Sequence, residues 1–212
     1  MSLADLRQDY SRESLTERDV DADPIVQFGK WFAQAQNAGL VEANAMALAT
    51  ATADGSPSVR MVLLKGADPS GFTFFTDYRS RKGEELSANP RAGLCFWWDV
   101  LQRQVRVEGT IAPVTAAESA DYFKSRPHGS QLGAWASTQS RPLPSREPLE
   151  TEVAKLAAKY PAGTEVPPPP HWGGFRLAPQ TFEFWQGRPS RLHDRIVYTR
   201  SGSLWTIGRL SP

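Results

Sequence analysis

The sequence is poor in the residues that build disulfides and metal sites. Its 212 residues include one cysteine and three histidines, so an internal disulfide is excluded and a dedicated zinc site is not expected. No window reaches the eighteen or more apolar residues of a membrane-spanning helix, and the N-terminal stretch MSLADLRQDYSRESLTERD lacks the apolar segment of a secretory signal. These absences predict a cytoplasmic protein without a bound metal ion.

An excess of one charge and several catalytic motifs are also missing. The formal net charge is +1, so anion recognition has to come from local clusters of lysine and arginine, which argues against a nucleic-acid-binding surface. The sequence contains no G-x-x-x-x-G-K-[ST], G-x-G-x-x-G, H-E-x-x-H or G-x-S-x-G pattern. Nucleoside triphosphate chemistry and metal-dependent hydrolysis are therefore not indicated.

The patterning predicts one domain, residues 23–212, behind a partly mobile N-terminal arm, residues 1–22. Asp23 as N-cap and Pro24 at the first helical position predict a helix that Gly39 ends. One face of that helix is expected to carry the apolar stripe Ile25, Phe28, Phe32 and Ala35.

Strand-like runs dominate the rest of the chain. Five β-rich runs between residues 45 and 114, separated by turn signals such as DGSP and DPSG, predict antiparallel strands. Thr115 and Glu118 form a capping box that predicts a helix up to Pro127, and a second helix is expected at about 145–160. Four further runs, GGFRLAP, TFEFWQG, DRIVYTR and LWTIGRL, predict strands that join the same sheet. The expected fold class is mainly β with flanking helices (α+β), an antiparallel barrel or sandwich. Cys95, within the run AGLCFWW, is expected to be a buried core thiol.

Three stretches are candidate anion sites. In YRSRKGEEL, Ser80, Arg81 and Lys82 are expected to open a helix, where free backbone N–H groups favour a phosphate; the alternative is a solvated helix start with Glu84 and Glu85 as partners. In YFKSRPHGSQLGAW, the residues Tyr122, Arg126 and Ser130 bracket a proline corner. In RMVLLK, alternation would place Arg60 and Lys65 on opposite faces of a strand unless a bulge intervenes.

The stretch WQGRPSRLHDR supports two interpretations. Arg191, His193 and Arg195 are spaced like alternate side chains on the solvated face of a strand. Three cationic or donor groups on one face also repel each other unless an anion or an electron-rich ring lies between them. The stretch alone does not decide between the two.

Seven ordered blocks resemble the pyridoxine (pyridoxamine) 5′-phosphate oxidase family. They are RMVLLK, FFT followed by SRKGEEL, NPRAGLCFWW, RQVRVEG, YFKSRPHGSQLGAWASTQS, WGGFR and EFWQGRPSRLHDR, and the similarity runs from LRQDY near the start to RLSP at the end. The resemblance implies an FMN-binding split β-barrel that works as a homodimer, with FMN at the subunit interface.

The resemblance also implies roles for individual residues. FMN is expected to contact Arg60, Met61, Val62, Leu63, Leu64, Lys65, Phe75, Thr76, Arg81, Lys82, Gln104, Gln139, Ser140, Trp185 and Arg195. The substrate phosphate is expected on Lys65, Tyr122, Arg126 and Ser130. Arg191 and His193 are the expected catalytic pair on the pyridine ring, with Arg7 and Tyr10 in a mobile cover.

The implied reaction oxidises pyridoxine or pyridoxamine 5′-phosphate to pyridoxal 5′-phosphate, with dioxygen as electron acceptor and hydrogen peroxide as by-product. Because the cofactor carries this chemistry, the protein is expected to orient the reactants. His193, close to Arg191 and Arg195, is expected to be neutral. The alternatives are a split-barrel FMN- or deazaflavin-dependent reductase, which has no need of a second phosphate site, and a non-catalytic flavin- or pyridoxal-phosphate-binding protein.

Overall fold

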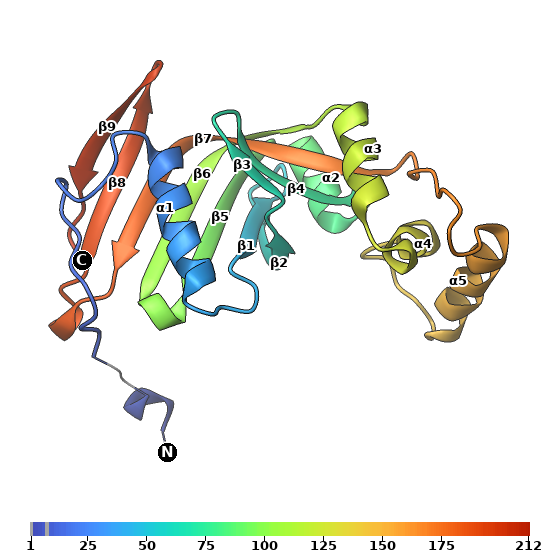
Figure 1. The fold of residues 1–212 in the computed structure, drawn as a ribbon, viewed down its shortest axis with the longest axis horizontal. Helices are drawn as coiled ribbons and strands as arrows, with labels where there is room; N and C mark the ends of the chain where they lie inside the picture. The colour runs from blue at the N-terminus through green and yellow to red at the C-terminus, as the bar shows by residue number, and fades with distance from the viewer. Residues whose placement is uncertain (1, 7–8) are drawn as a thin grey trace.

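The computed structural model describes residues 2–6 and 9–212, and its architecture is one curved antiparallel sheet with helices around it (Figure 1). The strands of the described residues are β1 Ala45–Ala51, β2 Pro57–Leu63, β3 Gly66–Asp68, β4 Gly71–Asp77, β5 Arg91–Trp98, β6 Arg103–Pro113, β7 Trp172–Gln186, β8 Asp194–Ser201 and β9 Leu204–Arg209. The helices are α1 Pro24–Asn37, α2 Arg81–Ala88, α3 Ala116–Ser125, α4 His128–Ala136 and α5 Glu147–Lys159, with short 3-10 turns η1 Leu3–Asp5, η2 Asp99–Leu101 and η3 Pro189–Arg191. None of these helices is long and apolar enough to cross a membrane. The mainly β class with flanking helices is thus confirmed.

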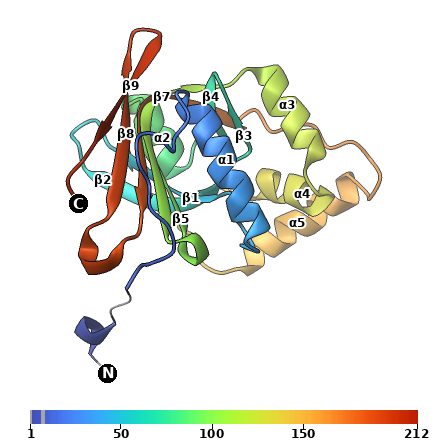
Figure 2. The same cartoon turned by 60° about the vertical axis from the view of Figure 1, so that its left-hand side comes forward.

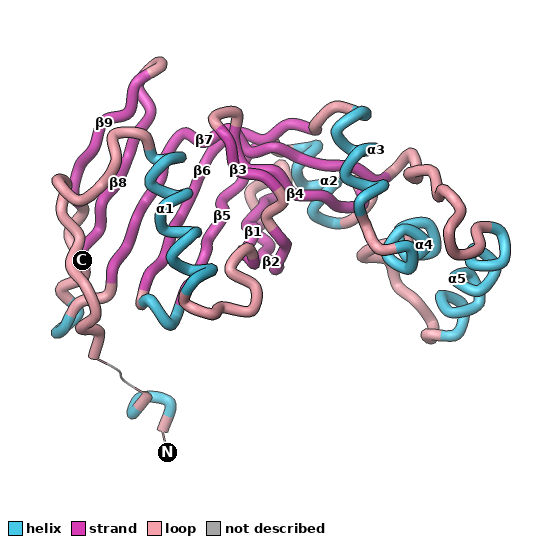
Figure 3. Tube along the Cα trace, viewed as in Figure 1, coloured by secondary structure: helices cyan, strands magenta, loops and turns pink. Residues whose placement is uncertain are grey.

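The sheet curls into a half-barrel because its two ends meet. The strand order is β2-β1-β5-β6-β7-β4-β3, and β8 and β9 extend the sheet from β7 (Figure 3). The chain passes from β2 to β3 through Leu64 and Lys65, whose backbone N–H groups donate to Asn44 O at 2.9 Å and Thr73 O at 2.8 Å. The chain itself thus connects the first strand of the order with the last, and the two bonds hold this connection against the residue before β1 and against β4.

The long strand β7 holds the two halves of the molecule together. Its first part pairs with β4 and its last part with β8, while β6 runs along both. The sequence predicts two strands here, GGFRLAP and TFEFWQG, and this prediction is wrong. Pro179 interrupts the pattern but lies at a register shift opposite Gly109, a β-bulge in which a residue without an N–H group is tolerated.

The main core lies between the concave face of the sheet and α1. The ring of Phe28 lies 4.9 Å from that of Phe72 and 5.1 Å from that of Phe96, and the ring of Trp31 lies 5.2 Å from that of Phe184. The side chain of Asp23 accepts a hydrogen bond from the N–H of Ile25, which confirms the predicted helix start. The predicted stripe is partly wrong: Phe28, Trp31 and Ala35 are buried, whereas Ile25 and Phe32 are only half-buried at its edge.

Helices α3, α4 and α5 form a second cluster at the opposite end of the molecule from β8 and β9 (Figures 1 and 2). Its buried side chains are Phe123, Leu132, Leu156, Val166 and Trp172. The capping box of Thr115 and Glu118 is present, and both predicted helices form, the second as α5. The first stops at Ser125, before the proline corner, and α4 starts directly after it.

Cys95 is not a core residue. Its neighbours on β5, Leu94 and Phe96, are buried, so strand alternation turns Cys95 toward the opposite face, where it is half-buried. Burial raises the pKa of its thiol, which disfavours the nucleophilic thiolate.

Part of the predicted arm lies against the domain. Leu15 is buried in the main core, and the hydroxyl of Tyr198 on β8 donates a hydrogen bond of 2.7 Å to the carbonyl of Asp21. The division of the chain at residue 22 stays a prediction.

Candidate functional site

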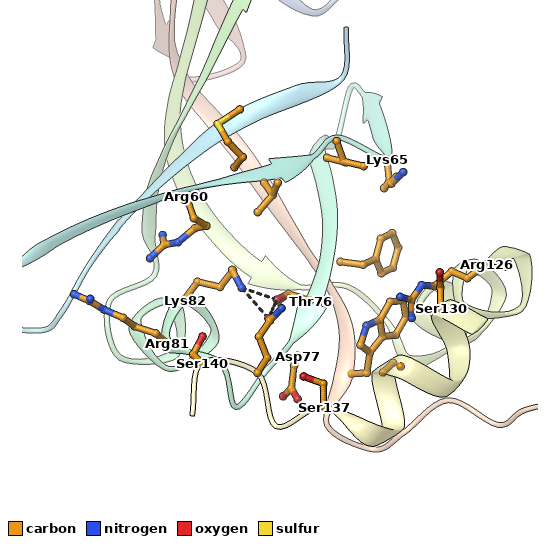
Figure 4. Close-up of a pocket in the computed structure, with 18 of the residues that line it drawn as sticks. Arg60, Lys65, Thr76, Asp77, Arg81, Lys82, Arg126, Ser130, Ser137 and Ser140 are labelled. Atoms are coloured by element: carbon orange, nitrogen blue, oxygen red, sulfur yellow. Dashed lines mark hydrogen bonds between the residues drawn. The ribbon is translucent and has the colours of Figure 1, made fainter. Parts of the chain in front are cut away.

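A cleft of about 800 Å³ opens between β2, β4, the start of α2 and the helices α3 and α4 (Figure 4). Its lining contains most of the predicted cofactor and substrate residues: Arg60, Met61, Val62, Leu63, Lys65, Phe75, Thr76, Arg81, Lys82, Tyr122, Arg126, Ser130, Gln139 and Ser140. The fold therefore brings together three stretches that lie far apart in the sequence. Figure 4 shows cationic side chains gathered at two ends of this cleft.

The first cationic end is built around the N-terminus of α2. Ser80 caps the helix by accepting the N–H of Gly83, and Arg81 and Lys82 follow in the opening turn, as expected. A Cβ atom at Gly83 would lie 2.2 Å from the carbonyl oxygen of Tyr78, so only glycine lets the helix start this close to the preceding loop. Arg60 reaches the same end from β2 (Figure 4).

Glu85, which is not part of the cleft lining, partly neutralises the positive charge of Arg60 and Arg81. Its carboxylate accepts hydrogen bonds from Arg81 at 2.8 Å and from Arg60 at 3.2 Å, and from the hydroxyls of Thr50 and Ser58 at 2.5 Å each. Burial opposes ionisation of Glu85, but these donors outweigh it and lower its pKa to about 2. Glu85 thus pairs with Arg81, as the alternative interpretation of SRKGEEL predicts for this glutamate. The cleft lining nevertheless keeps more cationic than anionic side chains.

Lys82 differs from Arg60 and Arg81 in having no carboxylate among its described hydrogen-bond partners. Its ammonium is buried and donates to neutral oxygens, at 2.9 Å to Gln139 Oε1, 3.2 Å to Thr76 Oγ1 and 3.4 Å to Ser80 Oγ. Burial, followed by repulsion from Arg60, lowers its pKa. An anion bound beside Lys82 would relieve both effects.

The second cationic end carries Arg126, Lys65 and Ser130 (Figure 4). The guanidinium of Arg126 lies over the ring of Trp172 at 4.8 Å, and its Nη1 is buried without a hydrogen-bond partner among the described residues. Burial lowers the pKa of Arg126. An unpartnered buried guanidinium edge facing a cleft is suited to an oxyanion. Lys65 lies beyond the end of β2, so strand alternation does not apply to it and it lines the same cleft as Arg60.

Aromatic rings form the wall near this second end. Phe75 stacks on Tyr122 with ring centroids 4.0 Å apart and on Trp172 at 5.5 Å. A Cβ atom at Gly174 would lie 2.8 Å from the Phe75 ring, so this glycine lets the ring lie flat against β7. The cleft therefore offers two anion sites joined by an apolar wall, which suits planar phosphorylated ligands.

A separate group of rings lies outside the cleft lining and is called here the aromatic cluster: Tyr10, Trp97, Trp185 and His193. The ring of Trp185 lies 4.5 Å from that of His193 and 5.9 Å from that of Trp97, and Tyr10 is 5.8 Å from both Trp185 and His193. The sheet register explains part of the arrangement, because Trp97, Gln104, Trp185 and Arg195 are paired in one row across β5, β6, β7 and β8.

The structure corrects the strand interpretation of WQGRPSRLHDR. Arg191 ends η3, and only Arg195 of the three residues lies on β8. Ser190 and Arg191 have φ angles of 56° and 61°, a left-handed conformation that breaks the alternation. Arg195 is held by Glu183, with N···O distances of 2.8 and 3.1 Å, so an internal carboxylate supplies its counter-charge.

His193 has the environment of a neutral imidazole. Its Nδ1 accepts the backbone N–H of Arg188 at 3.1 Å, and burial, followed by repulsion from Arg191, lowers its pKa below the ordinary 6.5. We expect His193 to titrate below pH 6.5 in an NMR titration of the three histidines. Arg191→Ala should raise this pKa only part of the way, because the burial remains. A wild-type His193 that titrates above 6.5 would contradict this assignment.

The predicted site residues thus fall into two groups in one chain. Gln104, Trp185, Arg191, His193, Arg195 and Tyr10 lie outside the cleft lining, Leu64 is buried in the main core, and Arg7 lies outside the described residues. Sequence reasoning missed Trp172, Asp77 and Ser137 in the cleft lining, and Trp97 in the aromatic cluster. The pair WW at 97–98 carried a signal, because alternation buries Trp98 and leaves Trp97 48% exposed.

Two family models cover most of the chain. One described as "Pyridoxamine 5′-phosphate oxidase" matches residues 32–160, and one described as "Pyridoxine 5′-phosphate oxidase C-terminal dimerisation region" matches residues 172–212. The second match spans β7, η3, β8 and β9 and so contains Trp185, Arg191, His193 and Arg195, four of the predicted residues outside the cleft lining.

Curated relatives agree with these matches. The pyridoxine/pyridoxamine 5′-phosphate oxidases of Cyanothece sp. and Paraburkholderia phymatum are 55% and 57% identical, each over 100% of this chain and 99% of the relative. PhzG from Burkholderia lata, solved in complex with tetrahydrophenazine-1-carboxylic acid, is 34% identical with a TM-score of 0.89 over 95% of this chain and 100% of that one. An FMN-binding protein from Nostoc punctiforme, 19% identical with a TM-score of 0.70 over 94% and 100%, shares the split-barrel fold. The chain belongs to the pyridoxamine 5′-phosphate oxidase family.

Proposed function

We propose that this protein is an FMN-dependent oxidase that converts pyridoxine 5′-phosphate or pyridoxamine 5′-phosphate to pyridoxal 5′-phosphate with dioxygen as acceptor. The observation that carries the proposal is a single cleft with a cationic site at each end, because cofactor and substrate each bring one phosphate. Lys82 at one end is a buried cation, and Arg126 at the other is half-buried with a buried Nη1; neither has a carboxylate partner among its described hydrogen bonds.

The residues at the start of α2 fit the phosphate of FMN. Free backbone N–H groups of the first turn, the ammonium of Lys82 and the guanidiniums of Arg60 and Arg81 would hold it, while Thr76, Gln139 and Ser140 line the same end. Met61, Val62 and Leu63 of β2 supply an edge for the planar ring system. FMN, when bound, supplies the two-electron oxidation and passes the electrons on to dioxygen.

The residues at the other end fit the substrate phosphate. Arg126, Lys65, Ser130 and Tyr122 would anchor it, and the wall of Phe75 lies alongside. Two anchored phosphates bring both planar rings into the same cleft, which contributes binding shared by the ground state and the transition state.

The overall reaction balances without a further redox partner. The alcohol of pyridoxine 5′-phosphate loses two electrons and two protons to become the aldehyde, and dioxygen takes them up as hydrogen peroxide. The amine of pyridoxamine 5′-phosphate loses the same two electrons and two protons, and water then hydrolyses the imine to the aldehyde and ammonia.

The site is completed in a homodimer under this proposal. The matched dimerisation region contains Trp185, Arg191, His193 and Arg195, none of which lines the cleft of its own chain. We infer that the partner subunit places this group over the cleft, with Arg191 and His193 on the substrate ring and Trp185, Gln104 and Arg195 near FMN. Each dimer then contains two equivalent sites.

Aerobic turnover tests the proposal. Purified protein supplied with either substrate should release pyridoxal 5′-phosphate and hydrogen peroxide in equal amounts, with ammonia only from the amine. If pyridoxal 5′-phosphate formed without hydrogen peroxide, the electrons would pass to an acceptor other than dioxygen, and the alternative of a split-barrel reductase would be supported. Tight flavin binding without aldehyde would support a non-catalytic binding protein.

A further inference from the structure

Arg209, at the end of β9, joins three segments that are distant in the sequence. Its Nε and Nη2 donate to the two carboxylate oxygens of Glu17 at 2.9 and 3.1 Å, and its Nη1 donates to Asp194 at 2.7 Å. Nη2 also donates to the carbonyl of Leu15 at 2.9 Å. These residues, Glu17, Asp194 and Arg209, are called here the arm latch. Two-pronged pairing with a carboxylate is the strongest geometry available to an arginine.

Leu15 is held in place by the arm latch and by a separate ion pair before it in the chain. The backbone N–H of Leu15 donates to Asp194 Oδ2 at 3.0 Å, and its side chain is 4% exposed. Upstream, Glu13 forms an ion pair with the buried Arg103. Around Leu15, the N-terminal segment therefore docks through a buried apolar side chain with charged contacts on either side.

The residues that the arm latch holds are close in the chain to two members of the aromatic cluster, His193 and Tyr10. Asp194 directly follows His193 in the chain, so the carboxylate that holds Leu15 also fixes the backbone beside the imidazole. Tyr10 lies five residues before Leu15, and its ring packs on Gly187, where a Cβ atom would lie 2.8 Å from the ring. Between them, the N–H of Ser11 donates to Gln102 Oε1 at 3.2 Å.

We propose that Glu17, Asp194 and Arg209 are positioning residues that hold Tyr10 against Trp185 and His193. They thereby order the group of residues that each subunit contributes to the substrate site in its partner's cleft. The kinetic consequence rests on the proposed function, whereas the docking of the arm does not. Glu17 and Arg209 are 46% and 37% exposed, so the latch is held mainly by pairing at the surface and can be broken without disturbing the core.

Limited trypsin digestion measures the docking directly. Arg12 and Arg18 flank the docked segment and are exposed. Glu17→Gln should speed cleavage after both residues by about three- to tenfold, because it removes the charge but not the shape of the side chain. Lys30→Met breaks another exposed arm contact, the pair with Asp21, and is the matched control that should leave cleavage after Arg12 unchanged.

Kinetics show whether docking positions the site. Glu17→Gln and Arg209→Gln should each raise KM for pyridoxamine 5′-phosphate by about three- to tenfold at unchanged FMN content. The increase should be larger for Arg209→Gln, which also loses the bonds to Asp194 and the Leu15 carbonyl. The double variant should equal Arg209→Gln, because without Arg209 the Glu17 charge has no partner left to lose. Additive effects, or wild-type cleavage in both variants, would overturn the latch. Faster cleavage with unchanged KM would overturn its positioning role. If the variants are cleaved faster by trypsin but the wild-type protein oxidises neither substrate, the docking role of the arm latch would be supported and the proposed function would be wrong.

Discussion

Lys82→Met is expected to emerge from purification largely without FMN. The ammonium of Lys82 is buried beside neutral oxygens, so its charge is available to a bound phosphate. Truncating one partner of a buried charge pair costs about 2–5 kcal/mol, which corresponds to a dissociation constant raised by about thirtyfold to a few thousandfold. Methionine keeps the unbranched shape of the side chain and removes the charge. Equilibrium titration of the apoprotein with FMN measures the change.

Two neighbouring arginines serve as references for Lys82. Arg81 is 62% exposed and already paired with Glu85, so Arg81→Ala should weaken FMN binding by about tenfold or less. Arg79 lies in the loop before α2, pairs with Asp77 and is absent from the cleft lining, so Arg79→Ala should bind FMN normally. Wild-type FMN affinity in Lys82→Met would remove Lys82 from the proposed phosphate site.

Arg126→Ala is expected to raise KM with little effect on kcat. Arg126 offers the substrate phosphate a buried, unpartnered Nη1 at the end of the cleft away from α2. A hydrogen bond to a charged group contributes about 1.5–3 kcal/mol, so KM should rise by about tenfold to a hundredfold. The contact is the same in the ground state and the transition state, so kcat should stay within about threefold of the wild-type value. Steady-state kinetics with pyridoxamine 5′-phosphate measure both constants.

Lys124 and Arg191 provide the comparison for Arg126. Lys124, two residues away on α3, pairs with Glu165 at the surface, and Lys124→Ala should change neither constant. Arg191→Ala should lower kcat as well, because a pyridine ring free to tilt presents its reacting carbon poorly. A kcat loss in Arg126→Ala equal to that in Arg191→Ala would mean that the phosphate anchor also aligns the reacting atoms.

Local sequence signals predicted the elements that depend on neighbouring residues. The capping box of Thr115, the N-cap Asp23, the helix start at the stretch SRK and the proline corner after Arg126 are each set by a few adjacent residues, and all are present. Local signals gave wrong predictions where the structure of a residue depends on a second residue that is distant in the sequence. Pro179 looks like a strand end, but its bulge is compensated by Gly109 on β6. Arg195 looks like a free cation, but Glu183 on β7 pairs with it.

The resemblance to the family supplied candidate site residues but not their arrangement within one subunit. Spacing alone could not show that Lys65 and Arg60 line one cleft, because this follows from the turn of the chain after β2. Nor could it show that Arg191 and His193 lie apart from that cleft, because the separation follows from the length of β7. The roles of individual residues stay predictions, and the two groups make them testable separately.

Anaerobic mixing of the FMN-loaded protein with pyridoxamine 5′-phosphate tests the central claim most directly. The account predicts that the yellow flavin absorbance bleaches in a single turnover, that one pyridoxal 5′-phosphate forms per flavin, and that admission of air restores the colour with release of hydrogen peroxide. Flavin that stays oxidised in the presence of saturating pyridoxamine 5′-phosphate and pyridoxine 5′-phosphate would contradict it.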